Sequence, residues 1–560
     1  MRCPRCICGR IVAYRFAAGS SPDAMPARPV LAILRRLMLA DLAREVARRR
    51  TFAIISHPDA GKTTLTEKLL LYGGAIELAG SVTARRNQKR TASDWMTLEQ
   101  ERGISITSSA LQFEYRGFCL NLLDTPGHQD FSEDTYRTLM AADSAVMLLD
   151  AGKGVEAQTR KLFAVCRQRG LPIVTWINKL DRPGRDPFEL LDEVEEVLGI
   201  TAVPLTWPID SGDRFRGVYE RAGRQLHLFE RTVGGKHRAP VTAADLHESS
   251  VREMLGGEAH DQLLADVDLI EHGLPAFDRE AYLAERVTPV FFGSAVTNFG
   301  VQNFLDQFVS LAPPPGPLRT ESGLIEPTAG YFSGFVYKVQ ANMSKAHRDR
   351  VAFVRVASGS FERGMTATHV PSGRVLRLSY PHRLFGQERT TIDEAFPGDV
   401  IGLINPGVFR VGDTISAGPA FRIADFPRFA PEMFAQARPS DPSQRKSFLK
   451  GLEQLGEEGV VQIFRERSGA PTPILGAVGQ LQFEVFSYRM SAEYNVPIVV
   501  DTSQWTRVRW LSDEDAASLR NFGHLVLDEA GRTAALFKND WEIDYSLEKQ
   551  PELRLLATPP

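Results

Sequence analysis

The chain has 560 residues, of which 43% are hydrophobic and 24% charged, and its formal net charge is −3. This balance is that of a globular protein of about three or four domains, and the charge excludes a global basic field for binding nucleic acid. No apolar run is long enough to cross a bilayer, and five cysteines are too few for a disulfide framework, which favours the reducing cytoplasm.

The first 37 residues differ from the rest, because they are rich in arginine and contain one acid, Asp23. We interpret residues 1–37 as an extension from a start site assigned too early, with Met38 as the initiator; a targeting peptide is the alternative. Three cysteines here resemble half of a zinc site, but no fourth ligand lies nearby. Helical structure is expected to begin within residues 39–46.

The most informative stretch is SHPDAGKTT, which follows an apolar run at 52–55 and precedes a helical run at 65–72. A strand, a loop ending Gly-Lys-Thr and a helix predict a phosphate-binding loop whose backbone N–H groups cradle anionic oxygens. Lys62 is expected to reach the β and γ phosphates, and Thr63 to bind Mg²⁺. The usual pattern opens with glycine, where this chain has Ser56. The expected nucleotide contacts are Ser56, His57, Pro58, Asp59, Ala60, Gly61, Lys62 and Thr63.

A second motif, Asp124-Thr125-Pro126-Gly127-His128, follows the apolar run at 119–123. We expect Asp124 to hold the Mg²⁺ shell and the Gly127 N–H to sense the γ-phosphate. Thr125, Pro126 and His128 complete this part of the expected nucleotide site.

A third motif, Asn178-Lys179-Leu180-Asp181, follows the apolar run at 171–177. Asn178 and Asp181 are expected to read the base, because the Asp181 carboxylate can accept two hydrogen bonds from guanine and none of that kind from adenine. Each charge-assisted hydrogen bond contributes roughly 1.5–3 kcal/mol, enough to select one base. Ser294 and Ala295, after an apolar run, suit the last base-contacting loop.

The pattern of elements predicts an α/β GTP-binding domain over 38–318, with an insertion at about 205–285. Its expected parallel sheet is covered on both faces and has an antiparallel edge hairpin at Arg116-Gly117. Short alternating runs then predict a β-barrel over 319–428, and mixed helices and strands predict an α+β, ferredoxin-like domain over 429–560. The expected strands are 52–56, 111–115, 118–123, 145–150, 171–177 and 289–293, and the expected helices are 62–72, 132–141, 156–169, 186–198 and 301–312.

These motifs resemble those of the translational GTPases, and among them the bacterial class-II peptide-chain release factors. The resemblance includes the Ser56 that departs from the general loop pattern, and it runs from about residue 39 to about residue 510. The stretches that carry it are 51–62, 93–96, 102–107, 130–137, 341–343, 347–353 and 478–485.

The resemblance implies that His128 orients the attacking water, so that His128 and Lys62 are the expected catalytic residues. It also implies that the Ser105 hydroxyl ligates Mg²⁺ together with Thr63 and Asp124, and Thr107 is the alternative ligand. A basic cluster at 85–90 is expected either to touch rRNA phosphate or to form a solvated loop.

The implied function is a ribosome-dependent GTPase that removes class-I release factors after termination, converting GTP to GDP with Mg²⁺. Only about 60 residues follow Val496, too few for the further domains of translocating elongation factors. Because a Gly-Gly-Gln motif is absent, the chain is not expected to hydrolyse peptidyl-tRNA or to read stop codons. The expected partners are the ribosome and, indirectly on it, class-I release factors; we expect a cytoplasmic monomer that binds no membrane.

Two other hypotheses stay open at this point. One is a different GTPase that remodels stalled ribosomal complexes. The other is a GTP-gated binding protein in which the Ser56 and Pro58 substitutions prevent efficient hydrolysis.

Overall fold

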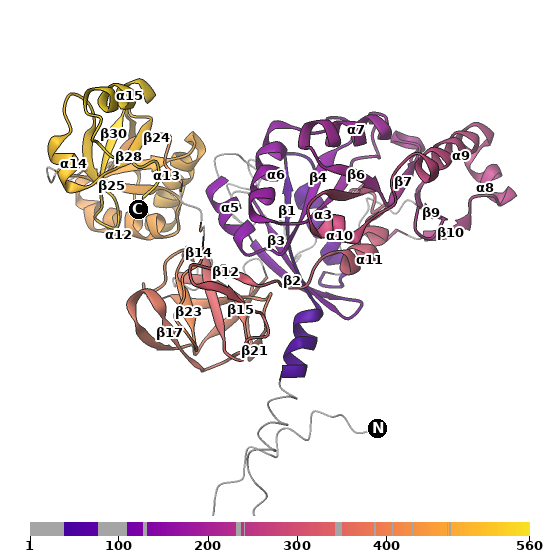
Figure 1. Ribbon diagram of the computed structural model, residues 1–560, viewed down its shortest axis with the longest axis horizontal. Coiled ribbons are helices and arrows are strands. Elements are labelled where there is room, and N and C mark those ends of the chain that lie inside the picture. The colour runs from indigo at the N-terminus through magenta and orange to yellow at the C-terminus, as the bar shows by residue number, and fades with distance from the viewer. Residues whose placement is uncertain are drawn as a thin grey trace, which may run out of the picture.

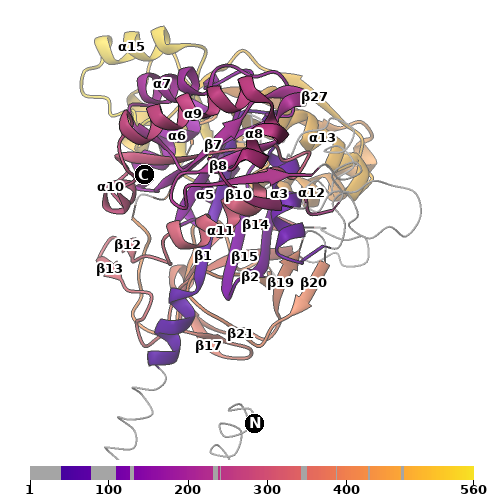
Figure 2. The same cartoon turned by 90° about the vertical axis from the view of Figure 1, so that its right-hand side faces the viewer.

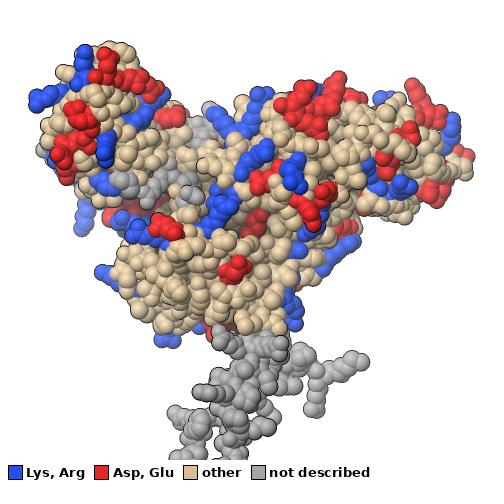
Figure 3. Space-filling model, viewed as in Figure 1, with Lys and Arg blue, Asp and Glu red and all other residues tan. Residues whose placement is uncertain are grey.

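The computed structural model describes residues 39–76, 109–126, 132–230, 237–239, 241–341, 350–385, 388–405, 407–424, 426, 429–467, 469 and 472–559. These residues form three parts: an α/β part with a protruding insertion, a barrel below it and a C-terminal α+β part beside both (Figure 1). Among them, no helix combines the length and the apolar composition needed to cross a bilayer. Charges of both signs are spread over all three parts on the face drawn in Figure 3.

A seven-stranded sheet with the order β2-β3-β1-β4-β5-β11-β6 forms the centre of the α/β part. Its strands pair in parallel except at the β2–β3 edge, where the Arg116-Gly117 turn closes the expected antiparallel hairpin. The predicted α/β class is therefore confirmed. The strands are β1 (Arg49–Ser56), β2 (Ser109–Tyr115), β3 (Phe118–Asp124), β4 (Ser144–Asp150), β5 (Ile173–Asn178), β6 (Thr201–Pro204) and β11 (Val287–Phe292).

Helices cover both faces of this sheet, because successive strand residues point to opposite sides. In β1, Phe52 and Ile54 pack in the core shared with α3 and α11, whereas Ala53 and Ile55 pack in the core shared with α5, α6 and α7. All four side chains are fully buried. The helices are α3 (Lys62–Tyr72), α5 (Ser132–Met140), α6 (Ala157–Arg169), α7 (Pro187–Leu198) and α11 (Val301–Leu311).

The segment between β6 and β11 forms a four-stranded antiparallel sheet with the order β10-β9-β8-β7, together with three helices. It protrudes from the first sheet in Figure 1 and faces the viewer in Figure 2. Its elements are β7 (Thr206–Ile209), β8 (Gly217–Glu220), β9 (Gln225–Phe229), β10 (Val241–Asp245), α8 (Ser249–Leu255), α9 (Gly257–His272) and α10 (Arg279–Leu283).

The barrel consists of an antiparallel eight-stranded sheet, β18-β17-β23-β14-β15-β22-β19-β20, with a separate β16–β21 pair. A small hairpin, β12 (Leu318–Thr320) and β13 (Gly323–Ile325), precedes it. The barrel strands are β14 (Ser333–Ala341), β15 (Arg350–Ser358), β16 (Phe361–Glu362), β17 (Thr366–His369), β18 (Arg374–Arg377), β19 (Pro381–Phe385), β20 (Glu388–Thr391), β21 (Glu394–Ala395), β22 (Val400–Asn405) and β23 (Thr414–Ser416).

The C-terminal part contains a seven-stranded sheet with the order β27-β24-β26-β25-β29-β30-β28. Its first four strands and two helices have the β-α-β-β-α-β connection of the expected ferredoxin-like unit. The last three strands extend that sheet beyond the predicted unit. The elements are β24 (Met433–Pro439), α12 (Arg445–Glu457), β25 (Gln462–Glu466), β26 (Ile474–Ala477), α13 (Gln480–Tyr494), β27 (Ile498–Thr502), β28 (Arg507–Trp510), α14 (Asp513–Ser518), β29 (His524–Leu527), β30 (Thr533–Phe537) and α15 (Asp540–Lys549).

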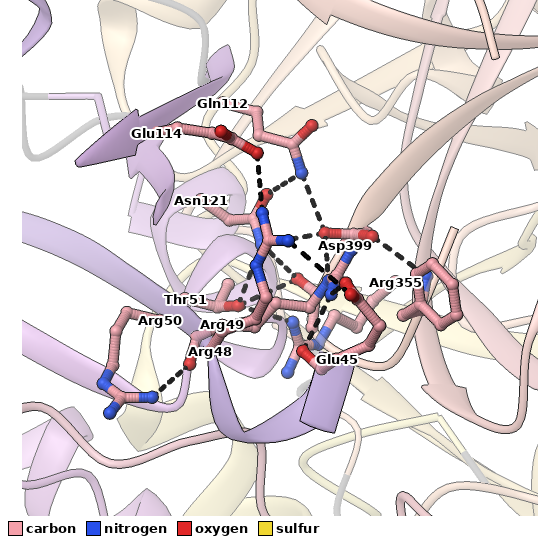
Figure 4. Close-up of polar contacts among 12 residues, drawn as sticks. Glu45, Arg48, Arg49, Arg50, Thr51, Gln112, Glu114, Asn121, Arg355 and Asp399 are labelled. Carbon is pink, nitrogen blue, oxygen red and sulfur yellow. Dashed lines mark hydrogen bonds and ion pairs between the residues drawn. The ribbon is translucent and has the colours of Figure 1, made fainter. Parts of the chain in front are cut away.

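A buried polar network centred on Asp399 joins the barrel to the first sheet (Figure 4). The Asp399 Oδ1 atom accepts hydrogen bonds from Arg49 Nε at 2.9 Å, Gln112 Nε2 at 2.8 Å and Asn121 Nδ2 at 3.2 Å. These donors come from β1, β2 and β3. The other carboxylate oxygen accepts from the Phe396 N–H at 2.9 Å, so the buried charge is fully hydrogen-bonded.

The neighbouring backbone of Gly398 belongs to the same interface. Its carbonyl oxygen accepts from Thr51 Oγ1 at 2.8 Å and from Asn121 Nδ2 at 3.0 Å. Gly398 has a φ of +103°, and a Cβ atom there would lie 2.7 Å from Pro315 Cγ. Arg355 of the barrel completes the contact by donating to Thr51 Oγ1 at 2.8 Å. The close approach of the two parts therefore requires glycine at this position.

Replacing Asp399 by Ala removes the carboxylate that Arg49 faces, and the Arg49 side chain is only 7% exposed. We expect a loss of about 3 kcal/mol of stability, because Arg49 keeps only its ion pair with Glu45 and the buried donors of Arg49, Gln112 and Asn121 lose a charged acceptor. The shift of the urea unfolding midpoint of the full chain measures it. Asp393→Ala is the control, since its ion pair with Arg363 is exposed and is worth about 1 kcal/mol or less. Equal shifts in the two variants would contradict the assignment.

Candidate functional site

A cavity of about 300 Å³ lies where β1 and β5 end and α3 begins. Open α/β sheets bind ligands at this edge, beyond the carboxyl ends of parallel strands. The cavity brings together residues of two predicted motifs that are far apart in the sequence. It is lined by Ser56, His57, Pro58, Asp59, Gly61, Lys62, Thr63, Thr64, Asn178, Lys179, Asp181, Arg182 and Val296.

Gly61 sets the shape of the phosphate loop. It is the N-cap of α3, with a φ of +102°, a left-handed conformation that glycine adopts without strain. A Cβ atom on Gly61 would lie 2.3 Å from Asn178 Nδ2. The loop can therefore pass this close to the third motif only with glycine. Asp59, with a φ of +65°, provides a second left-handed turn in the loop.

Lys62 is buried beside the second motif. Its Nζ atom donates to Asp124 Oδ1 at 2.8 Å and to the Thr125 carbonyl oxygen. The expected phosphate-binding cation and the expected Mg²⁺-shell carboxylate thus lie in direct contact. Thr125 is fixed in turn, because its hydroxyl donates to the Ile54 carbonyl oxygen at 2.6 Å.

Asn178 connects three loops of the site. Its Nδ2 atom donates to the Ala60 carbonyl oxygen at 2.8 Å, and its Oδ1 atom accepts from the Ala295 N–H at 2.9 Å. The side chain is buried. In the structure Asn178 therefore holds the phosphate loop and the Ser294-Ala295 loop together, which is a positioning contact that the sequence motif does not reveal. Its contact with a base stays a prediction.

Asp181 lines the cavity, and one of its carboxylate oxygens accepts a hydrogen bond from the protein. Ser294 Oγ donates to Asp181 Oδ1 at 2.6 Å, which fixes the carboxylate plane at the predicted base-reading position. Leu180, expected to be part of the site, is buried below the cavity and donates its N–H to the Gly293 carbonyl oxygen at 3.3 Å. The predicted last loop thus meets the third motif directly.

Lys179 adopts a left-handed φ of +69°, and its Nζ atom donates to Asp150 Oδ2 at 2.8 Å. Burial opposes ionisation of Asp150, but hydrogen bonds from Lys179 and the Gly152 N–H outweigh it and lower the pKa of that carboxyl. Asp150 stays ionised and anchors the Lys179 stem at the cavity wall.

Two polar atoms of the phosphate loop lack a hydrogen-bond partner among the described residues: Ser56 Oγ and His57 Nδ1 are both buried. Because buried polar groups are nearly always paired, these atoms fit a site that binds a polar ligand. Together with the N-terminus of α3, the residues present fit a nucleotide phosphate.

Two residues outside the sequence motifs, Glu156 and Val296, also contribute to the site. His57 Nε2 lies 3.2 Å from Glu156 Oε1, just before α6, and Val296 lines the cavity next to Ala295. Glu156 follows β4 at the same sheet edge as the three motifs. Its position shortly after a predicted strand could therefore have marked it in the sequence as a residue near the site. The predicted residues Ser105, Thr107, Gly127 and His128 lie outside the described residues, as do the basic cluster at 85–90 and the cysteines of residues 1–37.

Family models match three successive parts of the chain. The elongation factor Tu GTP binding domain matches residues 47–314, the elongation factor G domain 2 matches residues 331–418, and the class II release factor RF3 C-terminal domain matches residues 423–547. These matches agree with the observed α/β, barrel and α+β parts.

Curated relatives named peptide chain release factor 3 match almost the whole chain. The protein of Gloeobacter violaceus is 55% identical over 92% of this chain and 98% of its own length. That of Cyanothece sp. is 54% identical over 93% and 97%, and that of Symbiobacterium thermophilum 50% identical over 92% and 99%. The crystal structure of a protein from Thermus thermophilus shares the fold with a TM-score of 0.66 over 83% of this chain and 69% of its own, at 23% identity.

Replacing Gly61 by Ala is expected to weaken nucleotide binding at least about tenfold, because the left-handed backbone alone costs roughly 1–2 kcal/mol and the new Cβ would displace Asn178. Titration with fluorescent GDP measures the change. Gly74→Ala is the control at the far end of α3, since it has a similar positive φ and open space around it. An affinity loss shared by both variants would mean that the contact with Asn178 has no special role.

Replacing Asp181 by Asn is expected to move the base preference from guanine to xanthine, because the amide donates where the carboxylate accepts. Competition between GDP and xanthosine diphosphate measures the preference. Ser294→Ala keeps the charge and loses one hydrogen bond to Asp181, so it should weaken GDP binding without changing the preferred base. Unchanged guanine preference in Asp181→Asn would overturn the base-reading role.

Proposed function

Because the chain belongs to the peptide chain release factor 3 family, we propose that it uses GTP to drive class-I release factors off the ribosome after peptide release. It is a ribosome-dependent GTPase of translation termination, with GTP and GDP as substrate and product and Mg²⁺ as the metal. The observation that carries the proposal is the match to relatives named peptide chain release factor 3 over 92% of the chain. The missing Gly-Gly-Gln motif supports a factor that acts on another release factor.

We propose that separate groups of this chain hold the phosphates, the base, the metal and the attacking water. The phosphate loop from Ser56 to Thr63 binds the phosphates, and Lys62 neutralises charge that develops on them. Asp181, fixed by Ser294, reads the guanine edge. When bound, Mg²⁺ stabilises phosphate charge, and Thr63, Asp124 and Ser105 or Thr107 are its proposed holders. His128 orients the attacking water.

We further propose the division into a GTP-binding domain at 38–318, a barrel at 319–428 and an α+β domain at 429–560, after an extension at 1–37. The factor would act as a cytoplasmic monomer. Contacts with class-I release factors would be indirect and occur on the ribosome.

The test is the dissociation rate of a fluorescent class-I release factor from post-termination ribosomes. Adding this protein with GTP should accelerate dissociation at least about tenfold, because a GTP-bound state that binds the ribosome better can displace the occupant. Addition of GDP alone is the control. If the dissociation rate did not change although ribosomes still stimulated GTP turnover, the protein would act on another ribosomal substrate.

His128→Ala separates binding from hydrolysis in the same assay. We expect it to keep GTP affinity and lose ribosome-stimulated turnover, because it would remove the group that aligns water and leave the phosphate loop untouched. A loss of GTP affinity in this variant would make His128 a structural residue.

A further inference from the structure

The loop from Ser294 to Phe299 is closed by its own backbone next to the nucleotide cavity. The Ser294 N–H donates to the Phe299 carbonyl oxygen at 3.0 Å, and the Phe299 N–H donates back to the Ser294 carbonyl oxygen at 3.1 Å. Towards the cavity, the Ser294 hydroxyl donates to Asp181 at 2.6 Å. The Ala295 N–H donates to Asn178 Oδ1 at 2.9 Å. The position of this loop therefore determines where the two predicted base-reading side chains lie.

The other end of the loop, Asn298 and Phe299, packs against the insertion between β6 and β11, which protrudes in Figure 1. The Phe299 ring lies against the Phe229 ring of β9 with centroids 5.0 Å apart, and against the Phe215 ring with centroids 5.8 Å apart. Phe299 and Phe215 are buried, and aromatic pairs at such distances contribute more than the area they bury. The insertion thus provides an apolar surface on which the end of the loop rests.

A hydrogen bond fixes the adjacent residue to the same insertion. Asn298 Nδ2 donates to the His237 carbonyl oxygen, in the segment 237–239 that precedes β10. Asn298 is only 1% exposed, and its φ of +69° is a left-handed conformation that asparagine tolerates better than most residues. Because a buried amide without its acceptor is strongly unfavourable, this bond favours one position of the loop.

The segment 237–239 is also anchored to helix α3, which begins at the phosphate loop. The last carbonyl groups of a helix lack partners within the helix, and Arg238 Nη2 donates to two of them, those of Leu71 and Tyr72, at 3.2 and 2.9 Å. The Ala239 N–H donates to the Tyr72 hydroxyl oxygen at 3.2 Å. These contacts tie the acceptor of the loop hydrogen bond to the helix that carries the phosphate loop.

We propose that Asn298 and Phe229 are positioning residues of the guanine site, through which the insertion holds the Ser294–Phe299 loop in place beside Asp181. The inference rests on the proposed GTP site and deepens it, because it gives the insertion a direct part in selecting the base. Neither residue is among the described residues that line the cavity. Both act through the loop that fixes the base-reading carboxylate.

The test measures how well the full chain distinguishes GDP from ADP, because the phosphate loop can bind both whereas the loop contacts favour guanine. Competition against fluorescent GDP gives the two affinities. Asn298→Asp keeps the side-chain size and tolerates the left-handed backbone, but it places an acceptor against the His237 carbonyl oxygen. We expect the GDP affinity to fall at least about fivefold and the ADP affinity to stay within about twofold.

Phe229→Ala tests the same contact from the insertion, and Phe277→Ala is its matched control. Both are partly buried phenylalanines, but the Phe277 ring packs on Tyr282 and not on the loop. We expect Phe229→Ala to lower the ratio of GDP to ADP affinity at least about fivefold, and Phe277→Ala to leave it within about twofold.

If Asn298→Asp and Phe229→Ala weakened both nucleotides by the same factor, the contact would only support the fold, and the proposal would be overturned. An equal change of the ratio in Phe277→Ala would overturn it as well. Phe229→Leu, which leaves an apolar side chain, replaces Phe229→Ala should that variant not fold. A wild-type chain without preference for GDP would overturn the guanine site and this inference together, whereas unchanged ratios in the variants overturn the inference alone.

Discussion

The buried carboxylate of Asp399 determines how the barrel sits on the α/β domain. Its donors come from three strands of the first sheet, and two of these strands, β1 and β3, lead directly to Ser56 and Asp124 at the nucleotide edge. Because desolvating a charge is costly unless every partner is in place, this interface has one favourable geometry. The barrel and the sheet that carries the phosphate loop should therefore move as a unit.

The C-terminal domain is connected to the nucleotide site by different chemistry. It touches the α/β domain through α5, which is linked to the Pro126 carbonyl oxygen by one hydrogen bond of 3.4 Å and packs its Tyr136 ring on the Phe429 ring with centroids 4.7 Å apart. These contacts depend on the position of one short helix next to the second motif. A change in that motif would therefore alter the α5 contacts directly, whereas the Asp399 network draws its donors from β1, β2 and β3.

The sequence predicted what depends on local pattern. The strands, the helices, the Arg116-Gly117 hairpin and the phosphate loop follow from apolar periodicity and turn residues. It did not predict contacts between domains, because Arg49 and Asp399 are 350 residues apart and no local signal marks them as partners. Asn178 shows a subtler limit: both ends of its amide bind backbone and join two loops, which is a positioning contact that the motif alone does not reveal. The strands after residue 501 are short and lie in a sheet extension, so their pattern was weak.

The most direct test of this account measures two distances in the GDP-bound and GTP-analogue-bound protein by pulsed electron spin resonance. One pair of spin labels measures the distance from α7 to the barrel strand β17, and the other measures the distance from α7 to α15 of the C-terminal domain. We expect the first distance distribution to be the same with both nucleotides and the second to shift or broaden. A change in the first distance with the second one constant would contradict the central claim.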